Sequence, residues 1–278
     1  MNKKILSLLI IFGLLFCTLV LYIITFVFMD HSENNSGSGV TPIVNETPQP
    51  TPNVDAPIVP SEFDSRCENQ SLSIEIINVK YQNTLDYPQV SNMPLSCKSA
   101  EEKINGALEK HIAASYQNYL HLEEEEKAAR KFYEEQFGIP VPEEEDYIYS
   151  YEYTTQHEVK YQENNVLSLL IFDHIYAGGA HGATIVSSYN FDVSTGRQIL
   201  LEDVAKTSVN LDKIRQYVIA ELTERPEVFQ DSLVDVKIDN SRSFYFTETG
   251  IVIKFLEAEI APYAAGMPEV EVPNKVFQ

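Results

Sequence analysis

The sequence predicts an α+β fold: a mostly antiparallel sheet with two or three packed helices, preceded by one amino-terminal transmembrane helix and a Pro-rich tether. Three observations support this prediction. An uncharged apolar run opens the chain, residues 147–200 follow a period of two, and helical periodicity is confined to residues 99–137 and 210–225. Strands that outnumber a few segregated helices are typical of the α+β class.

The apolar run covers residues 5–29 and predicts an uncleaved membrane anchor. As a helix it would be about 37 Å long, more than the roughly 30 Å hydrocarbon core. It is longer than the apolar region of a cleavable signal, and no Ala-x-Ala pattern follows it. Cys17 follows Phe16, a poor context for lipidation, so we interpret it as a small buried side chain.

Basic flanks resist translocation, so Lys3 and Lys4 keep residues 1–4 as a cytoplasmic stub. The sequence therefore predicts a single-pass plasma membrane protein of a bacterium, with its carboxyl-terminal part extracytoplasmic. Residues 30–60 contain six prolines and few large apolar side chains, which is typical of a semi-extended linker. Beyond it we expect a strand and helix subdomain over 61–165 and a second domain over 166–278.

The net charge is −21, and residues 1–29 contribute only two lysines, so residues 30–278 carry −23. Nucleic acid and anionic lipid surfaces are poor partners for such a chain. A cationic partner would be attracted to it, although acidity that only maintains solubility is the alternative. Cys67 and Cys97 fit an oxidising compartment; paired, they would stabilise the fold by about 3–4 kcal/mol, and two independent thiols are the alternative.

The first part of the folded region predicts a strand followed by a long helix. Apolar residues alternate over 72–81 and change parity at Ile77, which suggests a bulge. Residues 99–102 have the pattern of a capping box, and one apolar helical face follows until Gly138 and Pro140. The glutamates at 123–126 are interpreted as a solvated face.

The second part predicts strands joined by turns. Tyrosines alternate over 147–153, residues 166–172 form a nearly all-apolar central strand, and residues 184–191 return after a glycine-rich turn. Asn210 is the expected N-cap of a helix that ends before Pro226. A hairpin over 244–256 and a terminal strand near 270–272 complete the prediction.

Few residues suggest chemistry. Asp173, His174 and His181 are the only cluster that resembles a catalytic or metal site. The two histidines have no convincing third ligand beside them, so no metal and no cofactor is predicted. A two-residue turn centred on Gly178 and Gly179 would place His174 opposite position 183. His181 is more simply explained as a hydrogen-bonding residue of its own turn, in which Gly178, Gly179 and Gly182 serve a tight backbone.

The tyrosine stripe over 147–153 is interpreted as core packing, with a binding platform for sugars or a protein as the alternative. No nucleophile elbow, phosphate loop, zinc helix or calcium loop is present, so the sequence does not predict an enzyme.

Two segments resemble the RsiV-like domain of unknown function. One is DHIYAGGAHGATIVSSYNFDVSTG at 173–196, and the other is FYFTETGIVIKFLEAEIAPYAAGMPEVEVP at 244–273. With the upstream strand and helix as a companion domain, the similarity extends over about 70–275. The candidate binding residues lie within these two motifs: Tyr176, His181, Tyr189, Pro262 and Tyr263.

The resemblance implies an extracytoplasmic domain, because members of this family form lysozyme-sensing ectodomains of anti-sigma factors or precede peptidoglycan deacetylase domains. Four cytoplasmic residues are too few for a domain that binds a sigma factor, and the sequence ends at Gln278 without a deacetylase domain. We therefore carry over neither sigma regulation nor deacetylation. We expect a cell-envelope binding or sensing module for a cell-wall glycan or a cationic lysozyme-like protein. A carbohydrate-active cell-wall hydrolase and a structural envelope protein without a ligand are the alternatives.

Overall fold

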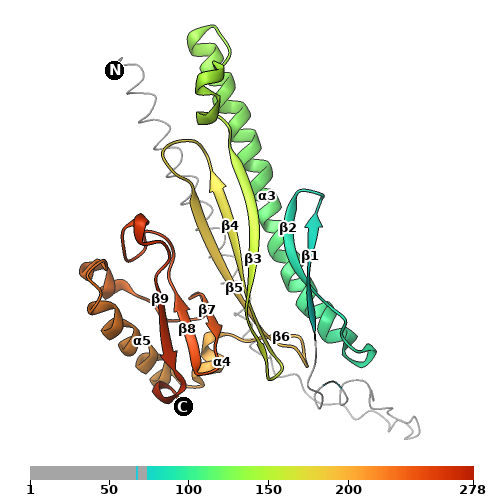
Figure 1. Ribbon diagram of the computed structural model, residues 1–278, viewed down its shortest axis with the longest axis vertical. Helices are drawn as coiled ribbons and strands as arrows, with labels where there is room; N and C mark the ends of the chain where they lie inside the picture. The colour runs from blue at the N-terminus through green and yellow to red at the C-terminus, as the bar shows by residue number, and fades with distance from the viewer. Residues whose placement is uncertain (1–66, 68–73) are drawn as a thin grey trace, which may run out of the picture. The chain divides into compact units, whose positions relative to one another are not determined.

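The computed structural model of the chain describes Cys67 and residues 74–278 (Figure 1). The predicted stub, membrane helix and linker at 1–60 lie outside these residues. Among the helices of the described region, none has both the length and the apolar character needed to span a bilayer. The described part is α+β with antiparallel sheets, as predicted.

The strands and α-helices follow one another along the chain: β1 (Glu75–Tyr81), β2 (Leu85–Ser91), α3 (Lys98–Phe137), β3 (Glu152–Glu163), β4 (Val166–Tyr176), β5 (Ala183–Asp192), β6 (Arg197–Gln198), α4 (Leu201–Ala205), α5 (Ser208–Thr223), β7 (Phe244–Phe246), β8 (Gly250–Lys254) and β9 (Glu269–Pro273). Short 3-10 turns lie between them: η2 (Leu95–Cys97), η3 (Glu143–Ile148), η4 (Gln230–Asp235), η5 (Tyr263–Ala265) and η6 (Asn274–Val276).

The central sheet has the order β3-β4-β5-β6 and is antiparallel throughout. β4 lies in its middle, and its apolar residues from Leu167 to Ile171 are fully or almost fully buried. A two-residue turn joins β3 to β4, and Asn164 and Asn165 both adopt positive φ there, the backbone that a type I′ hairpin requires.

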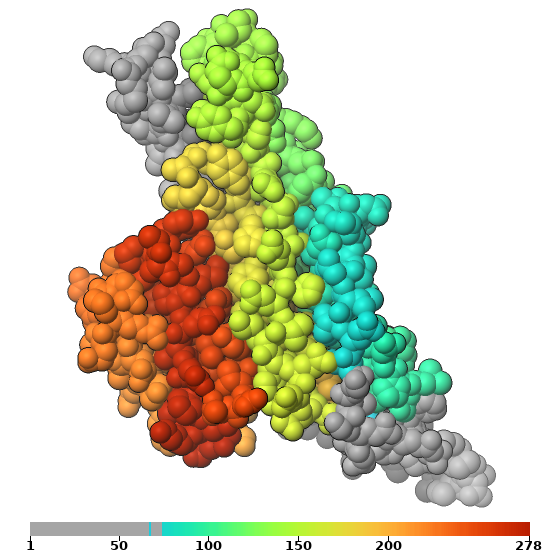
Figure 2. Space-filling model, viewed as in Figure 1, coloured from blue at the N-terminus to red at the C-terminus, as the bar shows by residue number. Residues whose placement is uncertain are grey.

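The carboxyl-terminal sheet, β7-β8-β9, packs between the central sheet and α5. Side chains of its strands alternate between these two neighbours, as the period of a strand requires. Tyr245 and Val252 face Leu170 and Val186 of the central sheet, while Ile251 and other alternating residues join the core beneath α5. Figure 2 shows this carboxyl-terminal part against the β3–β4 hairpin.

Side chains of the central sheet bond to the backbone of β7 and so fix the contact of the two sheets. Ser168 Oγ accepts from Phe246 N at 3.1 Å, and Ser188 Oγ accepts from Phe244 N at 3.0 Å. Asn190 Nδ2 donates to Phe244 O at 2.9 Å. The buried side chains of Ser168 and Asn190 and the half-buried Ser188 are therefore satisfied by the packing of one sheet on the other.

α3 packs on the opposite face of the central sheet and against β2. Its predicted inner face is confirmed, because Ile104, Leu108 and Ile112 are fully buried. The helix ends where predicted, at Gly138 in the left-handed conformation. The predicted capping box is wrong, because Cys97 is the N-cap and makes no side-chain cap bond.

Other predictions needed correction. β2 was not predicted, and β1 pairs with it without the expected bulge; a bulge lies instead in β3, between Val159 and Tyr161. The second helix begins earlier than Asn210, after the N-cap Thr207, whose side chain accepts from Asn210 N. The hairpin β7–β8 and the strand β9 are as predicted.

The tyrosine stripe is only partly a strand feature. β3 begins at Glu152, so Tyr147 and Tyr149 precede it. Tyr149 and Tyr153 are buried, which confirms core packing for these two, whereas Tyr147 is exposed. Cys67 and Cys97 form a disulfide with their Cα atoms 5.2 Å apart.

Candidate functional site

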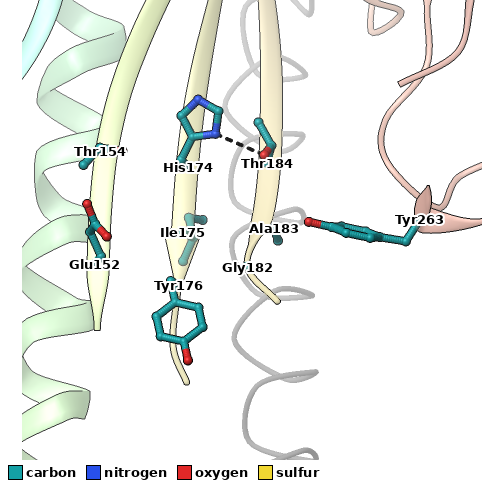
Figure 3. Close-up of a pocket in the computed structure, with 9 residues that line it drawn as sticks. All are labelled: Glu152, Thr154, His174, Ile175, Tyr176, Gly182, Ala183, Thr184 and Tyr263. Atoms are coloured by element: carbon teal, nitrogen blue, oxygen red, sulfur yellow. Dashed lines mark hydrogen bonds between the residues drawn. The ribbon is translucent and has the colours of Figure 1, made fainter. Parts of the chain in front are cut away.

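A shallow, open pocket of about 180 Å³ lies where β3 begins, β4 ends and β5 begins (Figure 3). We call it the strand-end groove. Its lining comes from three neighbouring strands and from one residue of the loop between β8 and β9: Glu152, Thr154, His174, Ile175, Tyr176, Gly182, Ala183, Thr184 and Tyr263.

The strand period places the polar side chains of the groove on one face. Thr154 pairs with His174, and His174 pairs with Thr184, so these three form a row across β3, β4 and β5. Glu152 pairs with Tyr176 in the next row of the same face. His174 Nδ1 and Thr184 Oγ1 share a hydrogen bond of 3.1 Å, which orients the imidazole in the floor of the groove.

The register differs by one residue from the expected two-residue turn. His174 faces Thr184 rather than position 183, because the connection between β4 and β5 takes six residues, 177–182. Gly178 has φ +79°, and a Cβ there would collide with the backbone O of Ile148. This close approach packs the loop against η3 and explains why glycine is needed.

The ring of Tyr176 lines the groove, and its hydroxyl is hydrogen-bonded within its own loop. The hydroxyl donates to Gly179 O at 3.1 Å. Along β4 the ring follows Phe172 and His174 at alternate positions, and those two rings are stacked with an angle of 8°. β4 therefore carries an aromatic strip, of which His174 and Tyr176 line the groove beside polar side chains.

Tyr263 forms the wall on the side of the carboxyl-terminal sheet, and Figure 3 shows its hydroxyl end directed toward Ala183. The residue is 40% exposed. His181 stacks on it, with ring centroids 4.1 Å apart and an angle of 19°, and does not itself line the groove. Nδ1 of His181 donates to Gly182 O at 2.8 Å, so the predicted bond of His181 within its own turn is confirmed.

The candidate binding residues from the sequence separate into two places. Tyr176 and Tyr263 line the groove, His181 supports Tyr263, and Pro262 is the exposed residue that precedes η5. Tyr189 lies elsewhere, because its position on β5 has the opposite parity to Thr184. It is buried against α3, where its hydroxyl and His111 Nδ1 are 3.1 Å apart.

The Asp173, His174 and His181 cluster does not converge. Asp173 is adjacent to His174 in the strand and therefore faces the other side of the sheet, where it is buried. There it accepts from His111 Nε2 at 3.1 Å and from the Tyr153 hydroxyl at 2.9 Å. The described residues contain no group of three side chains that could hold a metal ion.

The electrostatic environment of Asp173 is that of a paired carboxylate. Burial alone would raise its pKa, but the nearby His111 and the hydrogen bonds that it accepts outweigh burial, so the pKa of Asp173 lies below its ordinary value. Burial and the Asp173 charge in turn raise the pKa of the Tyr153 hydroxyl well above its ordinary value. We interpret this buried group as a structural link between α3 and the sheet.

Sequence reasoning missed Glu152, Thr154 and Thr184, which line the groove, and His111, which lies behind it. The strand period is a usable signal for the first three, since Thr154 and Thr184 lie opposite His174, and Glu152 lies opposite Tyr176 on the same face. His111 offers no comparable signal, because it is 62 residues from Asp173 in the chain.

The stretch of sequence that contains the floor of the groove is strongly acidic. Residues 132–196 carry eleven Asp and Glu side chains and only one Lys or Arg, Lys160. The loop from Phe255 to Pro268 carries Glu257 and Glu259 and no basic residue. Glu257 accepts from Thr184 N at 3.0 Å and so places a second carboxylate beside the groove.

Comparisons with known proteins give two family matches. Residues 74–184 match the family model described as "Deacetylase PdaC", and residues 202–275 match "Protein of unknown function (DUF3298)". The chain thus has a PdaC-like segment followed by a DUF3298-like segment; the comparisons do not show RsiV itself. No curated protein matches the chain.

Solved structures of DUF3298 proteins also match. One is a member of the family from Bacteroides fragilis NCTC 9343, with 18% identity, a TM-score of 0.49, and coverage of 74% of this chain and 90% of that one. Another is from Pseudomonas aeruginosa PAO1, with 14% identity, a TM-score of 0.43, and coverage of 75% and 93%.

Proposed function

We propose that this chain is an extracytoplasmic binding module of the bacterial cell envelope, and that a cell-wall glycan binds in the strand-end groove. The observation that carries the proposal is that two tyrosines, Tyr176 and Tyr263, line the same open groove as a row of polar side chains. A sugar presents an apolar ring face and a rim of hydroxyl groups. Aromatic rings suit the former, and threonine, histidine and glutamate side chains suit the latter.

The support from His181 strengthens this assignment. An exposed aromatic side chain loses conformational entropy when it stacks on a ligand. The stacking of His181 on Tyr263 orders the wall before a ligand arrives. A pre-ordered ring lowers the cost of binding, which is what a recognition site requires.

We propose binding rather than hydrolysis. Most glycosidases use two carboxyl groups on either side of the scissile bond. In the described part of the chain Glu152 is the only carboxylate that lines the groove. Glu257, beside the groove, accepts from the backbone N of Thr184, and Asp173 is buried on the other face of the sheet. Neither a metal nor a cofactor is part of this proposal.

The location belongs to the same proposal. The apolar run at 5–29 and the linker at 30–60 support an anchor that leaves the carboxyl-terminal part outside the cell. Protease added to intact cells should then degrade the domain. Protection of the domain until the cells are lysed would exclude this location.

The glycan proposal is tested by calorimetry on the full-length chain with chitin oligomers and muropeptides. We expect Tyr263→Ala to weaken binding by about tenfold, because about 1.4 kcal/mol of stacking is lost. Tyr147→Ala is the matched control, since Tyr147 is a 65% exposed tyrosine that does not line the groove. Absence of binding to every oligomer, or equal losses in the two variants, would refute the proposal.

A cationic lysozyme-like protein is the second candidate ligand. The observation that favours it is the excess of carboxylates over residues 132–196. Such a complex should weaken as salt rises, because screening shortens the reach of exposed charges. Binding of lysozyme that is lost at high salt and unaffected by Tyr263→Ala would favour this candidate over the glycan.

A further inference from the structure

We infer that the glycan recognised in the strand-end groove carries a protonated amine, as glucosamine does, rather than an N-acetyl group. The inference rests on the proposed glycan binding and specifies its chemistry. It begins from Glu152, the only residue with a carboxylate in the lining.

Glu152 makes no side-chain hydrogen bond or ion pair with any other described residue and is exposed on its strand. It stands directly opposite Tyr176 in the β3–β4 register. Cβ atoms of such pairs are about 4.5–5.5 Å apart. A sugar stacked on the Tyr176 ring would therefore lie within reach of this carboxylate.

The basic side chains packed against the loop and strand beside the groove are already paired. Arg242 is paired with Glu259 at 2.8 Å. The buried Lys254 is paired with Glu269 at 2.6 Å. No lysine or arginine lines the groove, so the Glu152 charge has no partner among the described side chains there.

Glu257 adds to the same field from the opposite side of the groove. Its carboxylate is fixed at the edge of β5 by the bond from Thr184 N, while Glu152 lies on β3. An N-acetyl group offers only a neutral amide to these carboxylates. A protonated amine offers a charge-assisted hydrogen bond, which is the stronger interaction.

The expected preference is moderate, because Glu152 is exposed to water and exposed ion pairs contribute little. We expect the full-length chain to bind glucosamine hexamer about three- to tenfold more tightly than N-acetylglucosamine hexamer, at a pH where the amine is protonated. Titration calorimetry in matched buffers measures both affinities.

Glu152→Gln should reduce this preference, because the affinity for the glucosamine hexamer falls more than the affinity for the acetylated hexamer. Glu163→Gln is the matched control, since Glu163 is an exposed glutamate of the same strand that does not line the groove. This control should retain the preference. Thermal unfolding of both variants shows whether the fold is preserved.

The outcomes distinguish failure of the amine preference from failure of glycan binding itself. Equal affinity for both hexamers, or tighter binding of the acetylated one, would overturn the inference and leave glycan binding in place. An undiminished preference in Glu152→Gln would also overturn it, since attraction by the general acidity of the chain would then be sufficient. Binding of neither hexamer would overturn the inference, and absence of binding to muropeptides as well would refute the proposed glycan binding.

Discussion

Asp173 is a buried carboxylate that accepts hydrogen bonds from two different elements. It is buried between α3 and the central sheet, and its two oxygens accept from His111 and Tyr153. Removing one partner of a buried hydrogen-bonded pair leaves the other unsatisfied, which costs more than the pair contributes.

We therefore expect Asp173→Asn to lower the free energy of unfolding by about 2–3 kcal/mol at neutral pH. The control is Glu135→Gln, which breaks the exposed Lys131–Glu135 pair of 3.7 Å. That change should cost less than about 0.5 kcal/mol. Chemical denaturation measures both, and equal costs would show that Asp173 does not depend on its buried partners.

The same carboxylate predicts a pH dependence. The pKa of Asp173 is lowered in the folded state, because His111 and the accepted hydrogen bonds outweigh burial. Its stabilisation is therefore fully present above the unfolded pKa of about 3.9, and is lost as pH falls through the folded pKa. The difference in stability between the wild type and Asp173→Asn should shrink below about pH 4; a constant difference in denaturation series down to about pH 3 would contradict the lowered pKa.

Gly178 and Gly179 allow a matched test of the loop that supports the groove. Both have positive φ, at +79° and +93°, but only a Cβ at Gly178 would collide with the backbone of Ile148. Gly179→Ala should cost about 1–2 kcal/mol through backbone strain alone. Gly178→Ala should cost at least about 1 kcal/mol more in denaturant unfolding, and equal values would mean that the loop moves away from η3.

At the scale of elements, two glycines of α3 have opposite expected effects on stability. Gly106 lies exposed in its interior, where an added Cβ would meet no other atom within 4 Å, whereas Gly138 ends the helix at φ +69°. Gly106→Ala should stabilise the chain by about 0.5–1 kcal/mol, and Gly138→Ala should destabilise it by about 1 kcal/mol. Thermal and chemical unfolding give the two signs, and the same sign for both would refute this account of the helix.

The elements that the sequence predicted well were those with a long, uninterrupted period. α3 and β4 are of this kind, because their buried residues repeat every three to four or are continuous over one segment. β2 was missed because Pro88 interrupts a short polar run, although it pairs with Asn78 of β1. Proline counts against a strand in sequence but is tolerated where an edge leaves its missing donor unused.

The candidate site could be predicted only as far as local motifs reach. Both loops that meet at the groove were found, because each contains a distinctive glycine-rich or proline-containing sequence. Tyr189 lies outside the groove and Thr184 lines it, because the six-residue connection shifts the β4–β5 register by one position from the expected one. A shift of one residue moves a side chain to the other face of a sheet, so local patterns alone could not assign these roles.

At the scale of the whole molecule, α3, the central sheet, the carboxyl-terminal sheet and α5 form successive layers. The groove lies at the open end of the central sheet, beside the loop that the next layer contributes. Layering therefore brings Tyr263 to strands that are about ninety residues earlier in the chain. The site requires both family-matched segments, since the PdaC-like segment supplies the floor and the DUF3298-like segment supplies the wall.

The disulfide between Cys67 and Cys97 links the start of the described chain to the beginning of α3, across a sequence separation of 30. Closing a loop of that length in the unfolded chain stabilises a protein by about 3–4 kcal/mol on the chain-entropy account. The double variant Cys67→Ser/Cys97→Ser should lose about that much in the free energy of unfolding, and reductant should lower the stability of the wild type but not of the variant. A loss below about 1 kcal/mol would contradict this expectation.

The same pair of cysteines links the fold to the compartment. Disulfides persist outside the cytoplasm and are rare inside it, where thiols are kept reduced. If the domain lies outside the membrane, a thiol reagent applied to denatured protein from freshly lysed cells should label Cys67 and Cys97 only after reduction. The matched sample is the chain without residues 1–29, which the proposal confines to the cytoplasm and in which both cysteines should label without reduction. Labelling of both cysteines in the full-length chain before any reductant is added would remove the extracytoplasmic location, and the access of the groove to a cell-wall glycan with it.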